Sequence, residues 1–249
     1  MLATALPEPF TWAHDQIHID LGDGARALFT TRRGGVATGP YASLDLAIGD
    51  GGHDPGAVRT NYARLATQIG VPRERIVQGR QVHEATVARV GGPDGIAEAT
   101  DGHATATPLL PLLVLTADCL PVALAADGAV AMLHAGWRGL AAGILGEGVA
   151  ALREVGGTGP VTAAIGPGAG PCCYEVGDEV RAAFADVPGA AQGRHVDLKA
   201  VASAHLRDAG VTRIHDTGLC TMCSDPALFF SHRRDAGVTG RQAGVAWRS

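Results

Sequence analysis

Apolar residues gather in short runs along the chain, and several of these runs alternate with segments of helical periodicity. The runs of strand length predict β-strands at 27–31, 76–82, 112–116, 122–125, 130–133, 161–165 and 212–215. Helical periodicity predicts helices at 57–69, 140–155, 177–184 and 196–209. Gly70 and Gly156 support two of the helix ends, since each follows the last periodic residues. The alternation predicts an α/β (α+β) fold, a single domain with a mixed β-sheet flanked by helices.

One pair of predicted strands is separated by Asp127-Gly128, a dipeptide that favours the two-residue turn of a β-hairpin. A hairpin closed there places His134 opposite Pro121. Cys119 is then a diagonal neighbour of His134, at about 7–8 Å between the backbones. Because zinc–sulfur and zinc–nitrogen bonds add roughly 2.3 and 2.0 Å, the two side chains can reach one ion. The hairpin therefore predicts a pair of candidate metal ligands.

Composition and charge narrow the class of protein. The chain is 46% hydrophobic but only 4% aromatic, which predicts a core of small, closely packed side chains. We expect one domain over residues 21–249, after a lead-in segment of residues 1–20. A net charge of -5 without a run of basic residues argues against nucleic acid or a membrane as a partner. The apolar run at 108–117 is too short to span a bilayer. The first ten residues lack the basic region of a secretion signal, so we expect a cytoplasmic protein.

A third metal ligand is available in His83, which follows the strand predicted at 76–82. Two imidazoles and one thiolate would leave a fourth tetrahedral position open for water or substrate, as in catalytic zinc sites. Zinc in such a site lowers the pKa of its bound water toward about 7. A histidine or cysteine beside a strand is more often a packed residue, however, and spacing alone does not decide between these interpretations.

The remaining cysteines permit a second, competing site. Cys220 and Cys223 form a C-x-x-C pair, and Cys172-Cys173 could complete a four-sulfur metal site. A disulfide is an alternative, and buried cysteines that act as small apolar residues are the interpretation the sequence favours. Adjacent cysteines are expected to have poor geometry for binding one ion.

Several motifs, taken in order along the chain, resemble one family. They are Phe29-Thr30-Thr31-Arg32, Gln81-Val82-His83, Asp118-Cys119-Leu120-Pro121, His134-Ala135-Gly136-Trp137-Arg138-Gly139 and Cys172-Cys173-Tyr174-Glu175-Val176-Gly177. The chain resembles the bacterial laccase-domain family, whose members are called polyphenol oxidases, peptidoglycan editing factors and zinc-dependent purine nucleoside phosphorylases. The resemblance covers residues 20–248, and it rests on the joint occurrence of the motifs.

The resemblance implies that His83, Cys119 and His134 are ligands of Zn²⁺, with Cu²⁺ as the alternative metal. It implies a purine nucleoside and phosphate as substrates, with phosphorolysis of adenosine, inosine and methylthioadenosine and a side activity as an adenosine deaminase. One position departs from the family pattern, because Asp45 stands where Asn is usual. A carboxylate there would be unfavourable beside an anionic substrate. His232 stands where an aromatic residue is common.

Roles for other residues follow from their chemistry. Arg32, beside a glycine-rich turn, is the predicted phosphate clamp, since a guanidinium binds oxyanions bidentately. Asp118, adjacent to a ligand, is the predicted proton shuttle, or alternatively a residue that caps the turn or holds the ligand in place. The other predicted substrate-binding residues are Ser43, Gln81, Arg138 and Tyr174.

Three other functions remain open at this point. A hydrolase that edits peptidoglycan precursors would use the same metal site, and a non-catalytic metal-binding module would need no substrate. A copper-dependent polyphenol oxidase is disfavoured because no H-x-H pair occurs among the ten histidines. The sequence leaves the choice between a monomer and a homodimer open.

Overall fold

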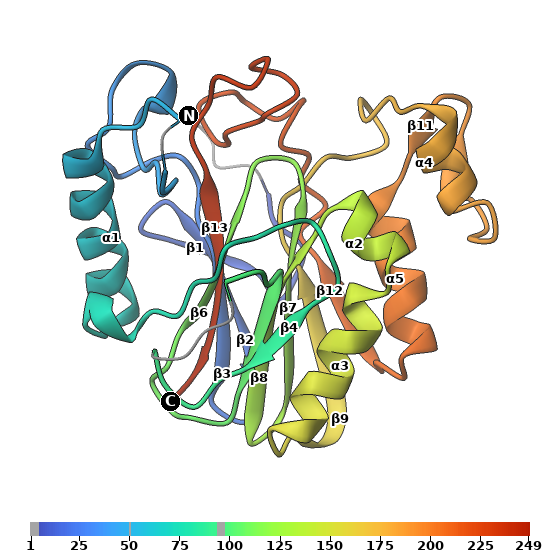
Figure 1. The fold of residues 1–249 in the computed structure, drawn as a ribbon, viewed down its shortest axis with the longest axis horizontal. Helices are drawn as coiled ribbons and strands as arrows, with labels where there is room; N and C mark the ends of the chain where they lie inside the picture. Colours follow the sequence, from blue (N-terminus) through green and yellow to red (C-terminus); the bar gives the residue numbers. More distant parts are fainter. Residues whose placement is uncertain (1–4, 50, 94–97) are drawn as a thin grey trace.

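Two β-sheets packed face to face form the centre of the structure, with helices against both outer faces (Figure 1). The computed structural model describes residues 5–49, 51–93 and 98–249. The first sheet contains, in spatial order, β1 (Thr11–Ala13), β2 (Gln16–Gly22), β3 (Ala25–Phe29), β13 (Gln242–Arg248) and β6 (Leu112–Thr116). The second contains β12 (Arg213–Asp216), β9 (Thr158–Ile165), β7 (Leu120–Asp127), β8 (Ala129–Ala135), β5 (Gly102–Thr105) and β4 (Val87–Arg89).

The second sheet is mixed, as predicted, because β12 pairs with β9 and β4 with β5 in parallel, whereas β7 pairs antiparallel with both β8 and β9. A separate two-stranded sheet joins β10 (Ala191–Gln192) and β11 (His195–Val196). The helices are α1 (Pro55–Ile69), α2 (Trp137–Ala141), α3 (Ile144–Glu154), α4 (Asp178–Ala183) and α5 (Leu198–Asp208), with short 3-10 helices at Gly39–Tyr41 and Arg73–Arg75.

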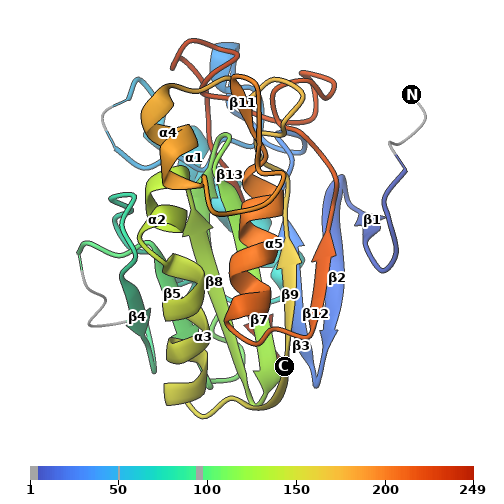
Figure 2. The same cartoon turned by 90° about the vertical axis from the view of Figure 1, so that its right-hand side faces the viewer.

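Alternating side chains of β7 show why both faces of the second sheet are buried. Val122 and Leu124 point toward the layer of α3 and α5, which lie side by side over this sheet (Figure 2). Ala123 and Ala125 point the other way, into the core between the two sheets. Small side chains let the sheets approach closely: a Cβ on Gly244 of β13 would lie 2.1 Å from the Met132 Cε atom.

The predicted hairpin is confirmed in its register. Pro121 of β7 pairs with His134 of β8, and the ladder continues to the pair Ala126 and Ala129 at the turn. Gly128 has a φ of 85°, which a side chain would disfavour, so the Asp127-Gly128 turn is the one that the sequence indicates.

Capping residues determine where two helices begin and end. Asp54 accepts a hydrogen bond from the Gly56 N–H, so α1 begins before its first periodic residue, and Gly70 ends it with a φ of 80°. Asp197 caps α5 in the same way through the backbone of Lys199 and Ala200. Both helices therefore agree with the predicted segments to within a few residues.

Two predicted elements are wrong. The helix predicted at 140–155 is broken into α2 and α3, because Gly143 adopts a left-handed φ of 87° between them. The strand predicted at 76–82 forms only isolated bridges, through Val77 and Arg80, within the described residues. The side chains of Gln81 and Asp101 hydrogen-bond to the backbone here and replace the strand ladder.

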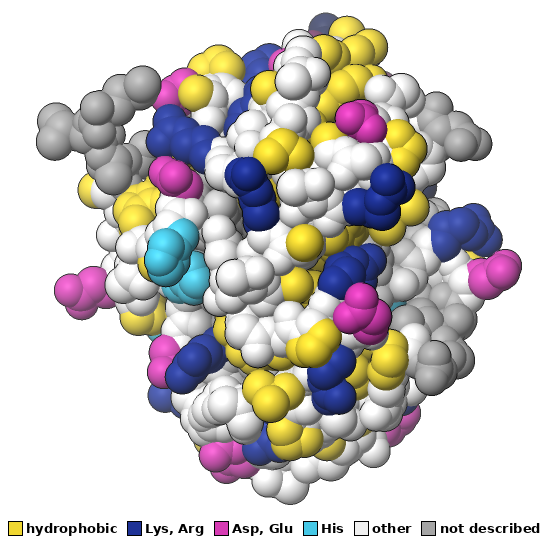
Figure 3. All heavy atoms as spheres, turned by 90° about the vertical axis from the view of Figure 1, so that its left-hand side faces the viewer, with side chains coloured by type: hydrophobic (Ala, Val, Ile, Leu, Met, Phe, Trp, Pro, Cys, Tyr) yellow, Lys and Arg dark blue, Asp and Glu magenta, His cyan; other side chains and the backbone are white. Residues whose placement is uncertain are grey.

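Strands β1 and β2 lie largely within the predicted lead-in segment and extend the first sheet beyond β3. None of the helices in the described part of the chain is long and apolar enough to cross a membrane. On the face seen in Figure 3, basic side chains are interspersed with acidic ones, consistent with the mixed charge of the chain.

Candidate functional site

His83, Cys119 and His134 come together at one end of the β7–β8 hairpin. Cys119 directly precedes β7, and His134 is the penultimate residue of β8. Their candidate ligand atoms, with one from His83, all lie within 4.8 Å of one another. The two imidazole rings are nearly perpendicular, at 82°, with centroids 4.8 Å apart. The structure therefore groups the three residues predicted as metal ligands.

A buried carboxylate, Asp101, orients the imidazole of His134 and holds the backbone of His83. Its Oδ1 atom lies 2.7 Å from His134 Nδ1 and accepts the His83 backbone N–H at 2.9 Å. Its Oδ2 atom accepts the backbone N–H groups of Val82 at 3.1 Å and Glu84 at 2.9 Å. Because Nδ1 of His134 is engaged with Asp101, Nε2 is the nitrogen left for a metal. Burial raises the pKa of Asp101, but these hydrogen bonds outweigh it and keep the pKa below its usual value.

The backbone of His83 is held in an unfavourable conformation. Its φ is 64°, in the left-handed region that a non-glycine residue rarely occupies. Hydrogen bonds from three consecutive N–H groups, those of residues 82–84, to one carboxylate hold this turn in place. Such strain is maintained only where the surroundings impose it, and it often marks a functional position.

Gly136 forms the floor beneath the sulfur of Cys119. A Cβ at this position would lie 2.9 Å from Cys119 Sγ and 3.3 Å from His83 Cδ2. The φ of Gly136 is -74°, so space rather than backbone conformation requires glycine here. The glycine of the His134-Ala135-Gly136 motif thus leaves room for two of the three ligands.

Electrostatics favour a thiolate at Cys119. Burial raises the pKa of the thiol, but the charge and hydrogen bond of His134 and a hydrogen bond from His83 outweigh it and lower the pKa to about 6. For His134, burial lowers the pKa, whereas the Cys119 thiolate and Asp101 raise it to about 9. A thiolate between two imidazoles, one of them oriented by a carboxylate, is a donor set that fits zinc with one open position.

A cleft of about 1040 Å³ opens over the three ligands. Four arginines from two regions of the chain line it, namely Arg73 and Arg80 between α1 and β4, and Arg233 and Arg241 between β12 and β13. Other polar and aromatic residues of the lining are His53, Glu74, Gln78, Gln81, Thr116, Asp118, Tyr174 and His232. The cleft therefore combines a candidate metal site with four positively charged side chains, and these charges would favour binding of an anionic co-substrate.

Gln81, Asp118 and Tyr174, which were predicted as substrate-binding or proton-transferring residues, line the cleft, and two of them have their polar groups engaged. The Gln81 amide pairs with the backbone of Leu115, at 2.8 and 2.7 Å. The Asp118 carboxylate accepts the Thr221 hydroxyl at 2.6 Å and the Arg233 backbone N–H at 2.8 Å. Both side chains thus hold segments of the cleft wall.

Arg32 and Ser43 lie outside the cleft lining in the described part of the chain. The Arg32 guanidinium donates to the carbonyl oxygens of Ala42, Pro40 and Pro226 at 2.6 to 3.2 Å, and it stacks over the Phe230 ring. The Ser43 hydroxyl donates to the Arg32 carbonyl oxygen. The Arg32 guanidinium and the Ser43 hydroxyl, which were predicted to bind phosphate or substrate, therefore hold two loops together instead.

Arg138 also lies outside the described lining, with its guanidinium 4.4 Å from the centroid of the adjacent Trp137 ring. The charges of Cys119 and Arg233 both act on the hydroxyl group of Tyr174. Burial raises the pKa of Tyr174 to about 12, with a smaller contribution from Cys119. Its hydroxyl is therefore neutral at physiological pH and can donate a hydrogen bond.

Asp45, the departure from the family pattern, is buried beneath the cleft rather than exposed to it. Its carboxylate lies 2.5 Å from His53 Nδ1 and accepts the backbone N–H groups of Ala47 and Arg241. A carboxylate that is fully buried and paired in this way does not confront an anion directly. Asp45 instead joins His53 to the backbone of Ala47 and Arg241.

One residue of the site carries no sequence signal of its own. Asp101 lies in none of the motifs, and its spacing from His83 along the chain gives no indication that the two residues are in contact. A ligand histidine usually has a carboxylate or carbonyl partner for its second nitrogen, so a partner could be expected, but the fold alone identifies it.

The fold and the cleft together define a class of protein, a mixed α/β domain with an open site of two histidines and one cysteine. The profile of the family described as "Multi-copper polyphenol oxidoreductase laccase" matches residues 26–249, and the chain belongs to this laccase-domain family. The resemblance inferred from the motifs is thereby confirmed.

Relatives extend over nearly the whole chain. A purine nucleoside phosphorylase of Mycobacterium tuberculosis is 42% identical over 251 residues, covering 92% of this chain and 97% of the relative. Another, of Pseudomonas aeruginosa, is 40% identical over 238 residues, covering 89% of this chain and 93% of the relative.

Solved structures show the same fold. The hypothetical protein YfiH of Bacillus licheniformis has a TM-score of 0.87 and 31% identity, covering 98% of this chain and 100% of that one. YlmD from Geobacillus stearothermophilus has a TM-score of 0.86 and 35% identity, covering 97% and 99% of the two chains. The α/β fold class predicted from the sequence is confirmed.

Proposed function

We propose that this chain is a zinc-dependent purine nucleoside phosphorylase that acts on adenosine, inosine and methylthioadenosine. The observation that carries the proposal is an open group of two histidines and one cysteine in a cleft lined by four arginines. The names of the relatives in Mycobacterium tuberculosis and Pseudomonas aeruginosa agree with it.

Arg80 is the proposed phosphate-binding residue of the cleft, in place of Arg32. Arg73, Arg233 and Arg241 already donate side-chain hydrogen bonds to backbone carbonyl oxygens. Within the described residues, the exposed guanidinium of Arg80 has no such partner, so all its donors are available for an oxyanion. Arg80 also lies only three residues before His83, on the segment that Asp101 and Gln81 fix.

Tyr174 is the proposed contact for the nucleoside. Its ring lies 5.4 Å from the Arg233 guanidinium, and both side chains line the cleft. A neutral, half-buried tyrosine offers a flat apolar face to a purine and a hydroxyl to the ribose. We assign Asp118 a positioning role, because its carboxylate holds the backbone of Arg233 and the hydroxyl of Thr221.

In phosphorolysis, a phosphate oxygen forms a bond to C1′ of the ribose while the bond from C1′ to the purine N9 breaks. The electron pair of that bond leaves with the purine, which takes up a proton, and ribose 1-phosphate is released. Zinc held by His83, Cys119 and His134 would supply a Lewis acid at its fourth coordination position. Arg80 would orient the phosphate, and Tyr174 would orient the nucleoside.

Deamination of adenosine is a second proposed reaction in the same cleft, in which water replaces the 6-amino group and ammonia is released. It differs from phosphorolysis in needing no phosphate. Copper is a competing metal, since it binds nitrogen and sulfur donors more tightly than zinc does. The family description refers to copper, so the assay must be run with each metal separately.

The test uses the full chain loaded with zinc or with copper. With zinc, adenosine and phosphate, we expect adenine and ribose 1-phosphate in equal amounts, and we expect both to be lost in Cys119→Ala. Without phosphate, inosine and ammonia report deamination.

The Arg80→Gln variant tests the phosphate site. Loss of a charge-assisted contact worth about 1.5–3 kcal/mol should lower kcat/KM for phosphate by roughly 10- to 100-fold, while the KM for adenosine changes little. Arg26→Gln is the matched control, because Arg26 is exposed on β3 and is not among the residues that line the cleft. The proposal fails if zinc-loaded protein releases no adenine. Cleavage of UDP-linked muramyl precursors in a parallel assay would then favour the peptidoglycan-editing hydrolase, and copper-dependent oxidation of a phenol would favour the polyphenol oxidase.

A further inference from the structure

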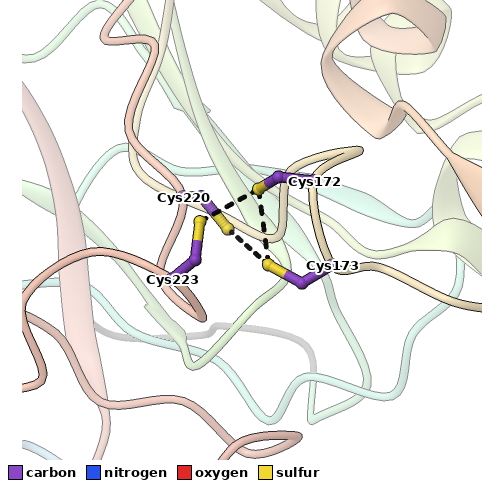
Figure 4. A group of neighbouring side chains, drawn as sticks. All are labelled: Cys172, Cys173, Cys220 and Cys223. Carbon is purple, nitrogen blue, oxygen red and sulfur yellow. Dashed lines mark hydrogen bonds between the residues drawn. The ribbon is translucent and has the colours of Figure 1, made fainter.

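Four cysteine side chains converge at a second place in the structure, outside the group of His83, Cys119 and His134. The sulfur atoms of Cys172, Cys173, Cys220 and Cys223 all lie within 4.8 Å of one another and point toward a common centre (Figure 4). The sequence favours buried cysteines acting as small apolar residues, and this is wrong for Cys172 and Cys223, which are exposed. Something other than apolar packing must account for the cluster.

The topology explains why cysteines 47 and 51 positions apart in the sequence meet. Strands β9 and β12 are parallel neighbours that end together, with Ile165 beside Asp216. The loops that follow them therefore leave the same edge of the sheet, and a further bridge joins Gly168 to Cys220. This places the Cys172-Cys173 pair beside the Cys220–Cys223 loop.

The sulfur–sulfur distances are somewhat shorter than those of a zinc-bound tetrahedron but much longer than the bond of a disulfide. Cys172 Sγ lies 3.3 Å from Cys173 Sγ and 3.0 Å from Cys223 Sγ, and Cys173 Sγ lies 3.5 Å from Cys220 Sγ. Four sulfurs bound to one zinc at about 2.3 Å would be about 3.8 Å apart. A disulfide needs about 2.05 Å, and each sulfur of the adjacent pair here contacts two others rather than one partner. The adjacent cysteines thus present their sulfurs to one centre, contrary to the expectation from the sequence.

Backbone N–H groups are directed at the most buried of the four sulfurs. The Gly170 N–H donates to Cys220 Sγ at 3.2 Å, and the N–H groups of Met222 and Cys223 hydrogen-bond to the same sulfur. A Cβ on Gly170 would lie 3.2 Å from Cys220 Cβ, so glycine permits this close approach. Donors of this kind stabilise a thiolate, which is the form of cysteine that binds metal.

We propose that Cys172, Cys173, Cys220 and Cys223 bind a second zinc ion, which has a structural role. Zinc replaces the thiol protons, which pass to solvent. Four protein ligands close the coordination sphere, so this ion offers no position to a substrate.

The proposed ion would link two walls of the cleft. Tyr174 follows Cys173 directly, and Thr221, between the cysteines of the other loop, donates its hydroxyl to Asp118. Arg234 donates to the Thr221 carbonyl oxygen at 2.8 Å and is itself paired with Asp235, so it fixes the backbone of this loop. The ion would therefore hold Tyr174 and Asp118 in place without contacting either.

Metal analysis of the full chain tests the proposal independently of any enzyme activity. We expect two zinc ions per chain in wild-type protein purified under reducing conditions, and one in each of Cys119→Ala and Cys223→Ser. Cys119→Ala leaves the four-cysteine cluster intact, so its remaining zinc is informative even if Cys223→Ser fails to fold.

Cobalt substitution identifies the ligands. Cys119→Ala should retain about four fifths of the thiolate-to-cobalt charge-transfer intensity, because four of the five cysteines remain. Cys223→Ser should lose most of that intensity and unfold at a lower temperature. A wild-type chain with a single zinc that Cys119→Ala removes would overturn the proposal. The proposal would also be overturned if freshly purified protein had a mass four hydrogens below that of the fully reduced chain, with two disulfides that join Cys172 and Cys173 to Cys220 and Cys223.

Discussion

Replacing Asp101 by asparagine should weaken both the fold and metal binding, because the carboxylate accepts four hydrogen bonds in two pairs. One oxygen serves His134 and His83, and the other serves Val82 and Glu84. Asparagine offers a single oxygen, and its amide N–H₂ would face two donors whichever way the side chain turns. One pair of hydrogen bonds is therefore lost in either orientation.

The size of the effect follows from this geometry. Hydrogen bonds to a charged group contribute about 1.5–3 kcal/mol each, so the loss of two costs roughly 3–6 kcal/mol. Asp101 is fully buried, which leaves no water to replace them. The same side chain orients the His134 ring and holds the backbone of His83, and a change of such a supporting residue lowers metal affinity by roughly 10- to 100-fold.

Guanidinium unfolding of the metal-free protein measures the first effect, and competition with a chromophoric chelator measures the second. Asp186→Asn is the matched control, because Asp186 is exposed. Near-ultraviolet circular dichroism should confirm that the variant is folded before its metal affinity is measured. A metal-free Asp101→Asn protein within about 1 kcal/mol of wild type, with unchanged zinc affinity, would show that the four hydrogen bonds do not support the site as argued.

Three further predictions concern other positions. Gly136→Ala places a Cβ 2.9 Å from Cys119 Sγ, so zinc affinity in chelator competition should fall by at least tenfold, whereas Gly146→Ala, with open space around it, should leave affinity unchanged. Gly143→Ala forces a side chain onto a φ of 87° and should cost roughly 1–2 kcal/mol in chemical denaturation, and equal stability to Gly146→Ala would contradict this. Burial lowers the pKa of His103 to about 4, so native His103 stays neutral while the unfolded chain takes up a proton below about pH 6.5, and stability falls as the pH falls through that window. Relative to His103→Leu, metal-free wild-type protein should lose roughly 2 kcal/mol between pH 7.5 and 5, and parallel pH profiles of the two proteins would refute the assignment.

The central hairpin could be predicted from the sequence because its information is local. A two-residue turn and two apolar runs determine which residues of β7 and β8 face each other, and Cys119 and His134 follow from that register. The ends of α1 and α5 are local for the same reason, since their caps lie in the adjacent residues. Two of the three candidate metal ligands, Cys119 and His134, can therefore be predicted from a short stretch of chain.

The rest of the site depends on contacts between distant segments. His83 does not end a strand, because side chains of Gln81 and Asp101 take the place of the ladder there. Arg32 looked available for phosphate, yet three carbonyl oxygens from two other segments use its donors. Which polar groups remain free to bind a substrate depends on the tertiary structure, so it cannot be predicted from the periodicity of apolar residues in the sequence.

The position of β13 has a consequence for how the chain is made. This strand is synthesised after every other strand of the first sheet, yet it lies between β3 and β6 and pairs antiparallel with both. Until residue 248 has left the ribosome, β3 and β6 each present an unpaired edge, and such edges attach readily to other chains. A nascent chain stalled before β13 should consequently be prone to aggregation and to capture by chaperones. The first sheet is complete only when β13 has been inserted between β3 and β6.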